Sequence, residues 1–199
     1  MTSTSYVART NNAFILTETV KVAQLIHQGA TFDEIRQQVI EEDLFQLRSL
    51  TSRHRALNTV FHRLQKVDLS YIKLLATGIT DIRRLTNLFL ILRSDLLLRE
   101  LIDEVLLDKL KRLVYTVNPA DLRTFFETKR EQSSTIAKWS DSTYQKTASN
   151  TVLVLVSAGL LQAIKPRGNY EIRPIPIPGA LRQQLLLDGE ELYLRLMLN

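Results

Sequence analysis

The sequence predicts an all-α fold, mostly helical, with a short β-hairpin near its C-terminal end. Three observations support this prediction. Apolar residues recur at helical spacing through almost all of residues 1–117. A helical stretch opens with capping residues at Ser140 and stops at Gly159, where glycine can adopt the left-handed conformation that ends helices. Two short strand-like stretches follow, joined by the turn-forming residues 166–169.

Residues 1–117 are expected to form an N-terminal helical domain. Thr31 and Glu34 have the spacing of a capping box, in which each side chain bonds a free backbone amide of the first helical turn. Thr80 follows Gly78 and is expected to cap another helix. The helices expected in this domain cover residues 14–27, 31–40, 50–67, 70–77, 80–92 and 95–115.

A row of basic side chains lies on the expected helix at residues 50–67, opposite its apolar stripe. The row consists of Arg55, Thr59, His62 and Lys66, with Arg53 and Arg63 on its flanks. Arg53, Arg55, His62 and Lys66 are the candidate contacts. Two interpretations stay open. The row is either a solvated helix face or a second contact with nucleic acid, and in the second case residues 31–67 would form a helix-turn-helix of their own that binds phosphates.

Residues 118–178 are expected to form a winged helix-turn-helix domain. Asn118 is a good N-cap, Pro119 suits the first helical position and Asp121 adds an acid to the first turn, so a helix is expected to about Arg130. A short helix at 134–139 and the helix at 140–159 follow. Strands at 160–165 and 170–173 would form the wing, and residues 179–199 a last helix that folds back on the body.

One face of the expected helix at 140–159 carries short hydrogen-bonding side chains around a single cation. Such side chains can reach base edges and phosphates from within a major groove. The residues assigned to this contact are Ser142, Thr143, Lys146, Ser149 and Asn150. Lys165, Arg167 and Asn169 of the wing are assigned to the flanking phosphates.

Charge favours an anionic partner for this region. Residues 132–182 hold six cations, Lys138 among them, and two anions, so most of the net charge of +5 lies there. The sequence pI is about 9.6. Lys138 is therefore added to the expected DNA contacts. The alternative is a winged helix that contacts only proteins, because a fold alone does not fix function.

Several kinds of chemistry have no motif in this sequence. Cysteine is absent, which excludes disulfides, thiolate catalysis and zinc fingers. No phosphate-binding loop, nucleophile elbow or zinc-protease motif occurs, and the three histidines show no metal-site spacing. The most membrane-like run, Leu85 to Leu98, is shorter than the roughly 20 apolar residues of a span. The sequence therefore predicts a cytoplasmic protein that is no enzyme, needs no cofactor or metal, and does not contact the membrane.

Several of these motifs, taken in order, resemble the BrxA family, the small helical A component of BREX (bacteriophage exclusion) systems. They are Asn12-Ala-Phe-Ile-Leu-Thr-Glu18, Leu50-Thr-x-Arg53 with His62-Arg-Leu64, Phe125-Phe-x-x-Lys129, and Trp139-Ser-x-Ser-Thr143 leading to Gly159-Leu-Leu161. The resemblance covers residues 6–175, and the last unit is its most specific part. It implies a cytoplasmic, non-enzymatic DNA-binding protein that works beside a methyltransferase, an ATPase and other BREX proteins in antiviral defence.

The function expected from the sequence is therefore double-stranded DNA binding within phage resistance, mainly through phosphates and with weak sequence preference. Two alternatives remain. The winged helix could be an adaptor that docks another BREX component, or the protein could regulate transcription of its own operon.

Overall fold

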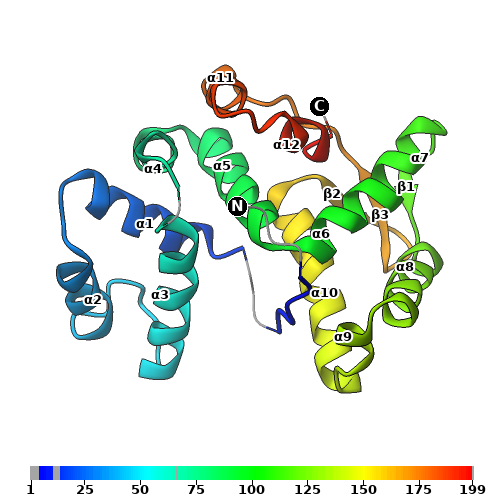
Figure 1. The fold of residues 1–199 in the computed structure, drawn as a ribbon, viewed down its shortest axis with the longest axis horizontal. Coiled ribbons are helices and arrows are strands. Elements are labelled where there is room, and N and C mark those ends of the chain that lie inside the picture. The colour runs from blue at the N-terminus through cyan, green and yellow to red at the C-terminus, as the bar shows by residue number, and fades with distance from the viewer. Residues whose placement is uncertain (1–4, 11–13, 66, 199) are drawn as a thin grey trace.

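The computed structural model describes residues 5–10, 14–65 and 67–198. Helices form most of this part of the chain, and a small antiparallel sheet lies beside its C-terminal helices (Figure 1). The predicted mostly helical class with a short hairpin is confirmed at this level. Within the described residues, no helix combines the length and the apolar character that crossing a bilayer requires.

In the described part of the N-terminal half, the secondary-structure elements are all helices. They are α1 (Leu16–His27), α2 (Phe32–Ile40), α3 (Leu50–Leu64), α4 (Leu69–Thr77) and α5 (Thr80–Ser94). The predicted capping box is confirmed, because the Thr31 side chain accepts from the Glu34 amide and the Glu34 carboxylate accepts from the Thr31 amide at 2.7 Å. The prediction that Thr80 caps a helix is wrong. Thr80 is the first residue of α5, after Ile79, whose side chain has no oxygen to offer.

Helix α5 is buried on every side along its C-terminal half. All residues from Leu85 to Leu92 are buried, including the polar Thr86 and Asn87. A helix without a solvent face belongs in the centre of a fold. Accordingly, α5 packs against α1, α3 and α4 of the N-terminal half, and against α10 (Asp141–Ala158) and α11 (Gly179–Leu187) of the C-terminal half.

A buried polar junction joins α3, α5 and the chain entering α1. The Asn87 side-chain amide donates to the Phe14 carbonyl oxygen at 2.6 Å, and Arg63 donates to the same oxygen at 3.3 Å. Arg63 is only 5% exposed, and this burial lowers the pKa of its guanidinium to about 9. The guanidinium is therefore still charged at neutral pH. The Phe14 carbonyl oxygen and the Asn87 side-chain oxygen solvate it in place of water.

A continuous helical rod follows α5, made of α6 (Leu96–Leu101), the π-helix η1 (Ile102–Leu107) and α7 (Asp108–Lys111). The predicted helix at 95–115 is too long, because the chain leaves the rod after Lys111 and Leu113 has a positive φ of 58°. The strand β1 (Thr116–Val117) comes next and was not predicted. The boundary predicted at residue 118 separates this strand from the sheet to which it belongs.

The following helices and strands agree with the prediction for residues 118–178. Helices α8 (Pro119–Gln132), α9 (Ser134–Ala137) and α10 precede the hairpin of β2 (Leu161–Ile164) and β3 (Asn169–Ile172). The Asn118 side chain caps α8 by accepting from the Ala120 and Asp121 amides, and Gly159 ends α10 with φ of 84°. Both β1 and β2 pair antiparallel with β3, so the strand order is β1-β3-β2.

Two helices close the chain where one was predicted. Helix α11 packs against α4 and α5, and α12 (Glu191–Leu196) packs against η1. The prediction of one continuous helix is wrong because Gly189 takes a left-handed φ of 68° between them. That conformation lets the chain reverse direction at little steric cost.

Replacement of Asn87 by alanine is expected to destabilise the fold by about 1–3 kcal/mol, because the Phe14 carbonyl and the Arg63 guanidinium lose a buried partner. Urea denaturation followed by circular dichroism measures the change. Asn58→Ala is the matched control, since Asn58 lies exposed on α3. Equal midpoints for the two variants would contradict a stabilising role for this junction.

Candidate nucleic-acid interface

The exposed side of α10 is polar with one cation. Ser140 caps the helix by accepting from the Thr143 amide at 3.3 Å, which orients the first turn. The exposed residues of α10 that follow Asp141 define the α10 face: Ser142, Gln145, Lys146, Ser149 and Leu153. Three residues of this face, Ser142, Lys146 and Ser149, were assigned from the sequence.

Two assigned residues of α10 lie at the edge of this face instead. Thr143 is half-buried and accepts from the Ser140 hydroxyl at 3.0 Å. Asn150 is half-buried and donates its side-chain amide to the Arg9 carbonyl oxygen at 2.8 Å. The exposed side is therefore rotated toward Gln145, a residue that sequence reasoning missed. Residues 5–10 contact the helix at Asn150, and periodicity alone carries no information about such a distant segment.

The N-terminal segment, residues 5–10, connects α10 to the start of the rod (Figure 1, dark blue). Arg9 pairs with Asp95 at 2.9 Å and donates to the Ser94 carbonyl oxygen at 2.8 Å. The Tyr6 hydroxyl donates to the Glu100 carboxylate at 2.9 Å. The segment is thus held to α6 by its side chains and to α10 by its backbone.

An ion cluster around the buried Lys129 attaches α8 to the same rod. Lys129 is 5% exposed and contacts Glu100 at 3.1 Å and Glu104 at 2.5 Å. Burial opposes the charge on Lys129, but its bonds to Glu104 and Glu100 outweigh that effect and raise its pKa. Since Glu100 also accepts from Tyr6, the N-terminal segment, the rod and α8 meet at one carboxylate.

The β2–β3 hairpin, which was predicted to be a wing, exposes two cations at its turn. Lys165 and Arg167 are exposed, and neither has an ion-pair partner within the described part of the chain. Asn169 is half-buried, and its side-chain amide donates to the Pro166 carbonyl oxygen at 2.8 Å, so it closes the turn. Gly168 has φ of 91° and lies so close to Pro119 that an added Cβ would meet its ring at 3.0 Å. The turn therefore rests on the first residue of α8.

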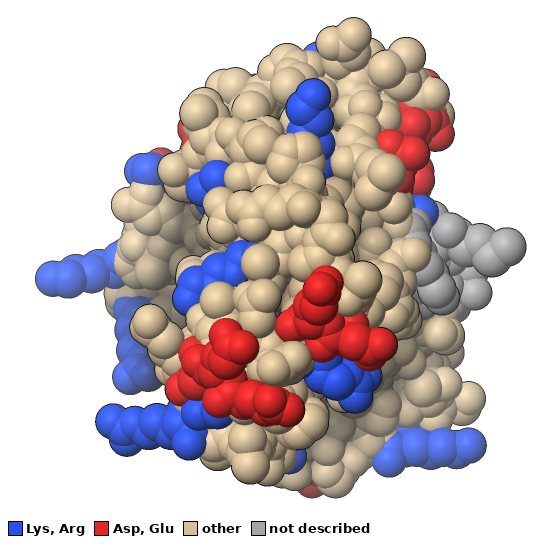
Figure 2. All heavy atoms as spheres, turned by 90° about the vertical axis from the view of Figure 1, so that its left-hand side faces the viewer, with Lys and Arg blue, Asp and Glu red and all other residues tan. Residues whose placement is uncertain are grey.

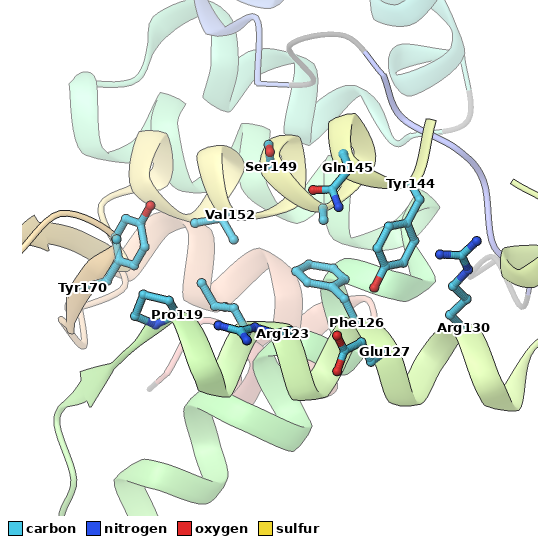
Figure 3. Close-up of a pocket in the computed structure, with 13 residues that line it drawn as sticks. Pro119, Arg123, Phe126, Glu127, Arg130, Tyr144, Gln145, Ser149, Val152 and Tyr170 are labelled. Carbon is cyan, nitrogen blue, oxygen red and sulfur yellow. The ribbon is translucent and has the colours of Figure 1, made fainter. Parts of the chain in front are cut away.

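A trough of about 600 Å³ runs between α8 and α10 and reaches the wing turn (Figure 3). Phe126 and Val152 lie in its buried floor. At one end Arg130 lies over the Tyr144 ring, 5.0 Å from its centroid, and pairs with Asp141 at 3.0 Å. Burial raises the pKa of Tyr144, and the nearby Glu127 carboxylate adds to this effect. Lys138 lies exposed between α9 and α10.

The basic row predicted on α3 is only partly available to a ligand. Arg53 pairs with Asp43 at 2.8 Å and donates to the Leu47 and Ile40 carbonyl oxygens, so it holds the connection between α2 and α3. Arg55 and His62 are exposed, and Lys66 lies outside the described residues. A helix-turn-helix at 31–67 stays a prediction, with residues 41–49 as its connection.

Charges of both signs share this side of the molecule. Figure 2 shows it, with acidic side chains gathered in two groups below the centre and Lys and Arg side chains projecting around the edge. The exposed acids of α2 and the residues just after it are Asp33, Glu34, Glu41 and Glu42. This side is therefore less suited to a polyanion than the wing and α10.

These features define a mostly helical protein with a small sheet and a polar, partly basic C-terminal surface. The BrxA family model matches residues 6–186, so the chain belongs to the BrxA family, as the resemblance predicted. The chain is 30% identical over 159 residues to the BREX protein BrxA of Bacillus cereus (strain H3081.97), covering 79% of this chain and 78% of that protein.

A solved structure has the same fold. The crystal structure of an uncharacterized protein from Magnetospirillum magneticum matches with a TM-score of 0.80, over 96% of this chain and 97% of that one. Sequence identity is 22%, so this likeness concerns the fold alone.

Replacement of Tyr6 by phenylalanine is expected to lower the free energy of unfolding at pH 7. It is also expected to make the free energy of unfolding less dependent on pH in the alkaline range. Burial, with the bond to Glu100 second, raises the pKa of Tyr6 from 10.0 to about 12. The folded state therefore keeps a proton that the unfolded state loses, and this contribution is full below pH 10 and disappears as the pH rises from 10 to 12.

Urea denaturation at pH 7 and across this alkaline range tests the effect. The stability difference between wild type and Tyr6→Phe should shrink as the pH rises. Tyr115→Phe is the control, since Tyr115 is 51% exposed. Parallel stability curves for wild type and Tyr6→Phe would show that the Tyr6 hydroxyl does not hold the segment.

Proposed function

We propose that this protein is a non-enzymatic, double-stranded DNA-binding component of a BREX phage-defence system and that it binds DNA with a winged helix-turn-helix. The order of elements from residue 96 to residue 172 supports this most directly: a helical rod, β1, α8, the short α9, α10, β2 and β3, with strand order β1-β3-β2. Winged helix-turn-helix domains have this order, and their recognition helix precedes the wing. Helix α10 occupies that place.

The chemistry of the α10 face fits a duplex. Hydroxyl, amide and ammonium groups on one exposed helix side can bond phosphates and base edges in a major groove. Lys146 is the cation of this face, and Ser142 and Ser149 are its short donors. In this proposal Lys165 and Arg167 contact the phosphates flanking the groove, and Lys138 those beside the start of α10.

Family membership supplies the biological setting. A relative with 30% identity is a BREX protein, which supports a role beside other BREX proteins in antiviral defence. We place this role in the cytoplasm, where phage DNA is exposed to the host. No step of the proposed function requires catalysis by this chain.

A second candidate function is an adaptor that docks another BREX protein. Leu153 favours it, because this apolar side chain is 43% exposed on the α10 face. A salt titration separates the two functions, since phosphate contacts weaken steeply as salt rises. Steeply salt-dependent duplex binding supports the DNA function. Binding to a BREX protein with an affinity that does not change with salt concentration, and without binding to DNA, supports the adaptor function. A preferred operator in the host genome would indicate a transcriptional regulator instead.

The double variant Lys146→Ala, Arg167→Ala is expected to bind duplex DNA more weakly and to lower the salt slope by roughly one to two units, because up to two phosphate contacts disappear. Fluorescence anisotropy over a salt series measures both quantities. Arg36→Ala, Lys73→Ala removes the same charge from exposed positions on α2 and α4 and is the matched control. If the Lys146→Ala, Arg167→Ala variant is folded and binds duplex DNA as tightly as the wild type, α10 and the wing are excluded from the DNA site.

Sequence preference is expected to be weak. The α10 face has no arginine and one lysine, whereas a bidentate Arg or Lys contact to guanine is the commonest specific contact and discriminates by about 1–3 kcal/mol. Unrelated duplex should therefore compete within about tenfold of any BREX-associated sequence, or roughly 1.4 kcal/mol. Selection from random duplexes checks this. Convergence on one motif, about a thousandfold above background, would contradict it and favour the regulator.

A further inference from the structure

The trough between α8 and α10 is larger than a crevice left by imperfect packing. Its volume of about 600 Å³ lies within the range of roughly 300–1,000 Å³ typical of small-ligand sites. Apolar side chains from both helices and the wing line it (Figure 3). They are Leu122, Phe126, Tyr144, Ala148, Val152 and Tyr170. Duplex contacts on the outer side of α10 leave this apolar interior unused.

Polar groups are placed along the two edges of this trough. In Figure 3 the Gln145 side chain points from α10 into the trough, and Arg123 and Glu127 line the α8 side. Gln145 and Arg123 are exposed and have no hydrogen-bond partner among the described residues. An amide offers both a donor and an acceptor, as the edge of a nucleobase does, and a guanidinium suits phosphate.

Aromatic rings stand at both ends of the trough. Tyr144 reaches from α10 toward α8 at one end, and Tyr170 of β3 lies at the other (Figure 3). The guanidinium of Arg130 already lies over the Tyr144 ring, 5.0 Å from its centroid. Unpaired bases stack on such rings with little regard to their identity.

We propose that this trough binds an unpaired nucleotide of a DNA strand, with the base stacked on an aromatic side chain at one end, Gln145 at its edge and Arg123 on its phosphate. The proposal rests on the proposed DNA function. Gln145 and Ser149 belong to both the trough and the α10 face, so a strand leaving a duplex on that face passes directly into the trough. A stacked, paired base cannot enter. The protein therefore prefers duplexes with a gap or an overhang.

Binding to a blunt duplex and to the same duplex with a three-nucleotide gap tests this. The wild type should bind the gapped duplex about tenfold more tightly or better, in line with stacking of a base on an aromatic side chain. A 2-aminopurine in the gap should lose fluorescence on binding, because it stacks. Arg123→Ala, Gln145→Ala should abolish both effects. Arg123→Ala alone changes no residue of the α10 face, and it should weaken the preference for the gapped duplex while leaving the affinity for blunt duplex unchanged.

Arg36→Ala, Gln37→Ala is the matched control, an exposed Arg and Gln pair on α2 that should keep the preference. Equal wild-type affinity for the two duplexes would overturn the trough proposal and leave the proposed function intact. A preference that survives in Arg123→Ala, Gln145→Ala would also overturn it. Tighter binding of free deoxyadenosine monophosphate than of the gapped duplex would assign the trough to a free nucleotide. Absence of binding to any duplex would overturn both proposals.

Discussion

Burial of α5 on every side is the constraint on which the rest of the fold depends. The run Leu85–Leu92 has no exposed residue, so every direction around it must be covered by another helix. Helices α1, α3 and α4 cover it from the N-terminal half, and α10 and α11 cover it from the C-terminal half (Figure 1). The position of α10, and hence of the polar face it exposes, is therefore fixed by packing against a helix about 60 residues earlier in the chain.

Most helix caps and stops could be predicted from the sequence, although Thr80 was wrongly predicted as a cap, and pairing between distant segments could not be predicted. The capping residues Thr31 and Asn118 and the stop at Gly159 act within one helical turn, so their spacing alone predicted them correctly. Strand β1 has two residues and exists only because β3, more than fifty residues later, pairs with it. The side of α10 that is exposed likewise depends on a bond from Asn150 to Arg9, 141 residues away.

The N-terminal segment gives α10 a second anchor, in addition to its packing against α5. Its side chains reach Asp95 and Glu100 on one side, while its backbone accepts from Asn150 on the other. Lys129 then ties α8 to the same Glu100. Both walls of the trough are thus attached to one helical rod, α8 directly and α10 through residues 5–10. A cavity between two helices keeps its width when both are fixed to a common support, as a preformed binding site requires.

The number of basic residues in the sequence is larger than the number of cations that are free to contact an anion. Many cations of its N-terminal half donate to backbone carbonyl oxygens inside the fold: Lys21 to Leu44, Arg53 to Ile40 and Leu47, Arg63 to Phe14, Arg83 to Ala76, and Arg99 to Leu92. Such donors are already committed, so moving them to a phosphate would leave those oxygens unpaired. In contrast, Lys138, Lys146, Lys165 and Arg167 are exposed and have no hydrogen-bond or ion-pair partner among the described residues. Arg36, Arg55 and Lys73 are exposed without such a partner too, but they lie singly on α2, α3 and α4. The four cations of the C-terminal half differ in that they lie on α10, the β2–β3 turn and the residue after α9.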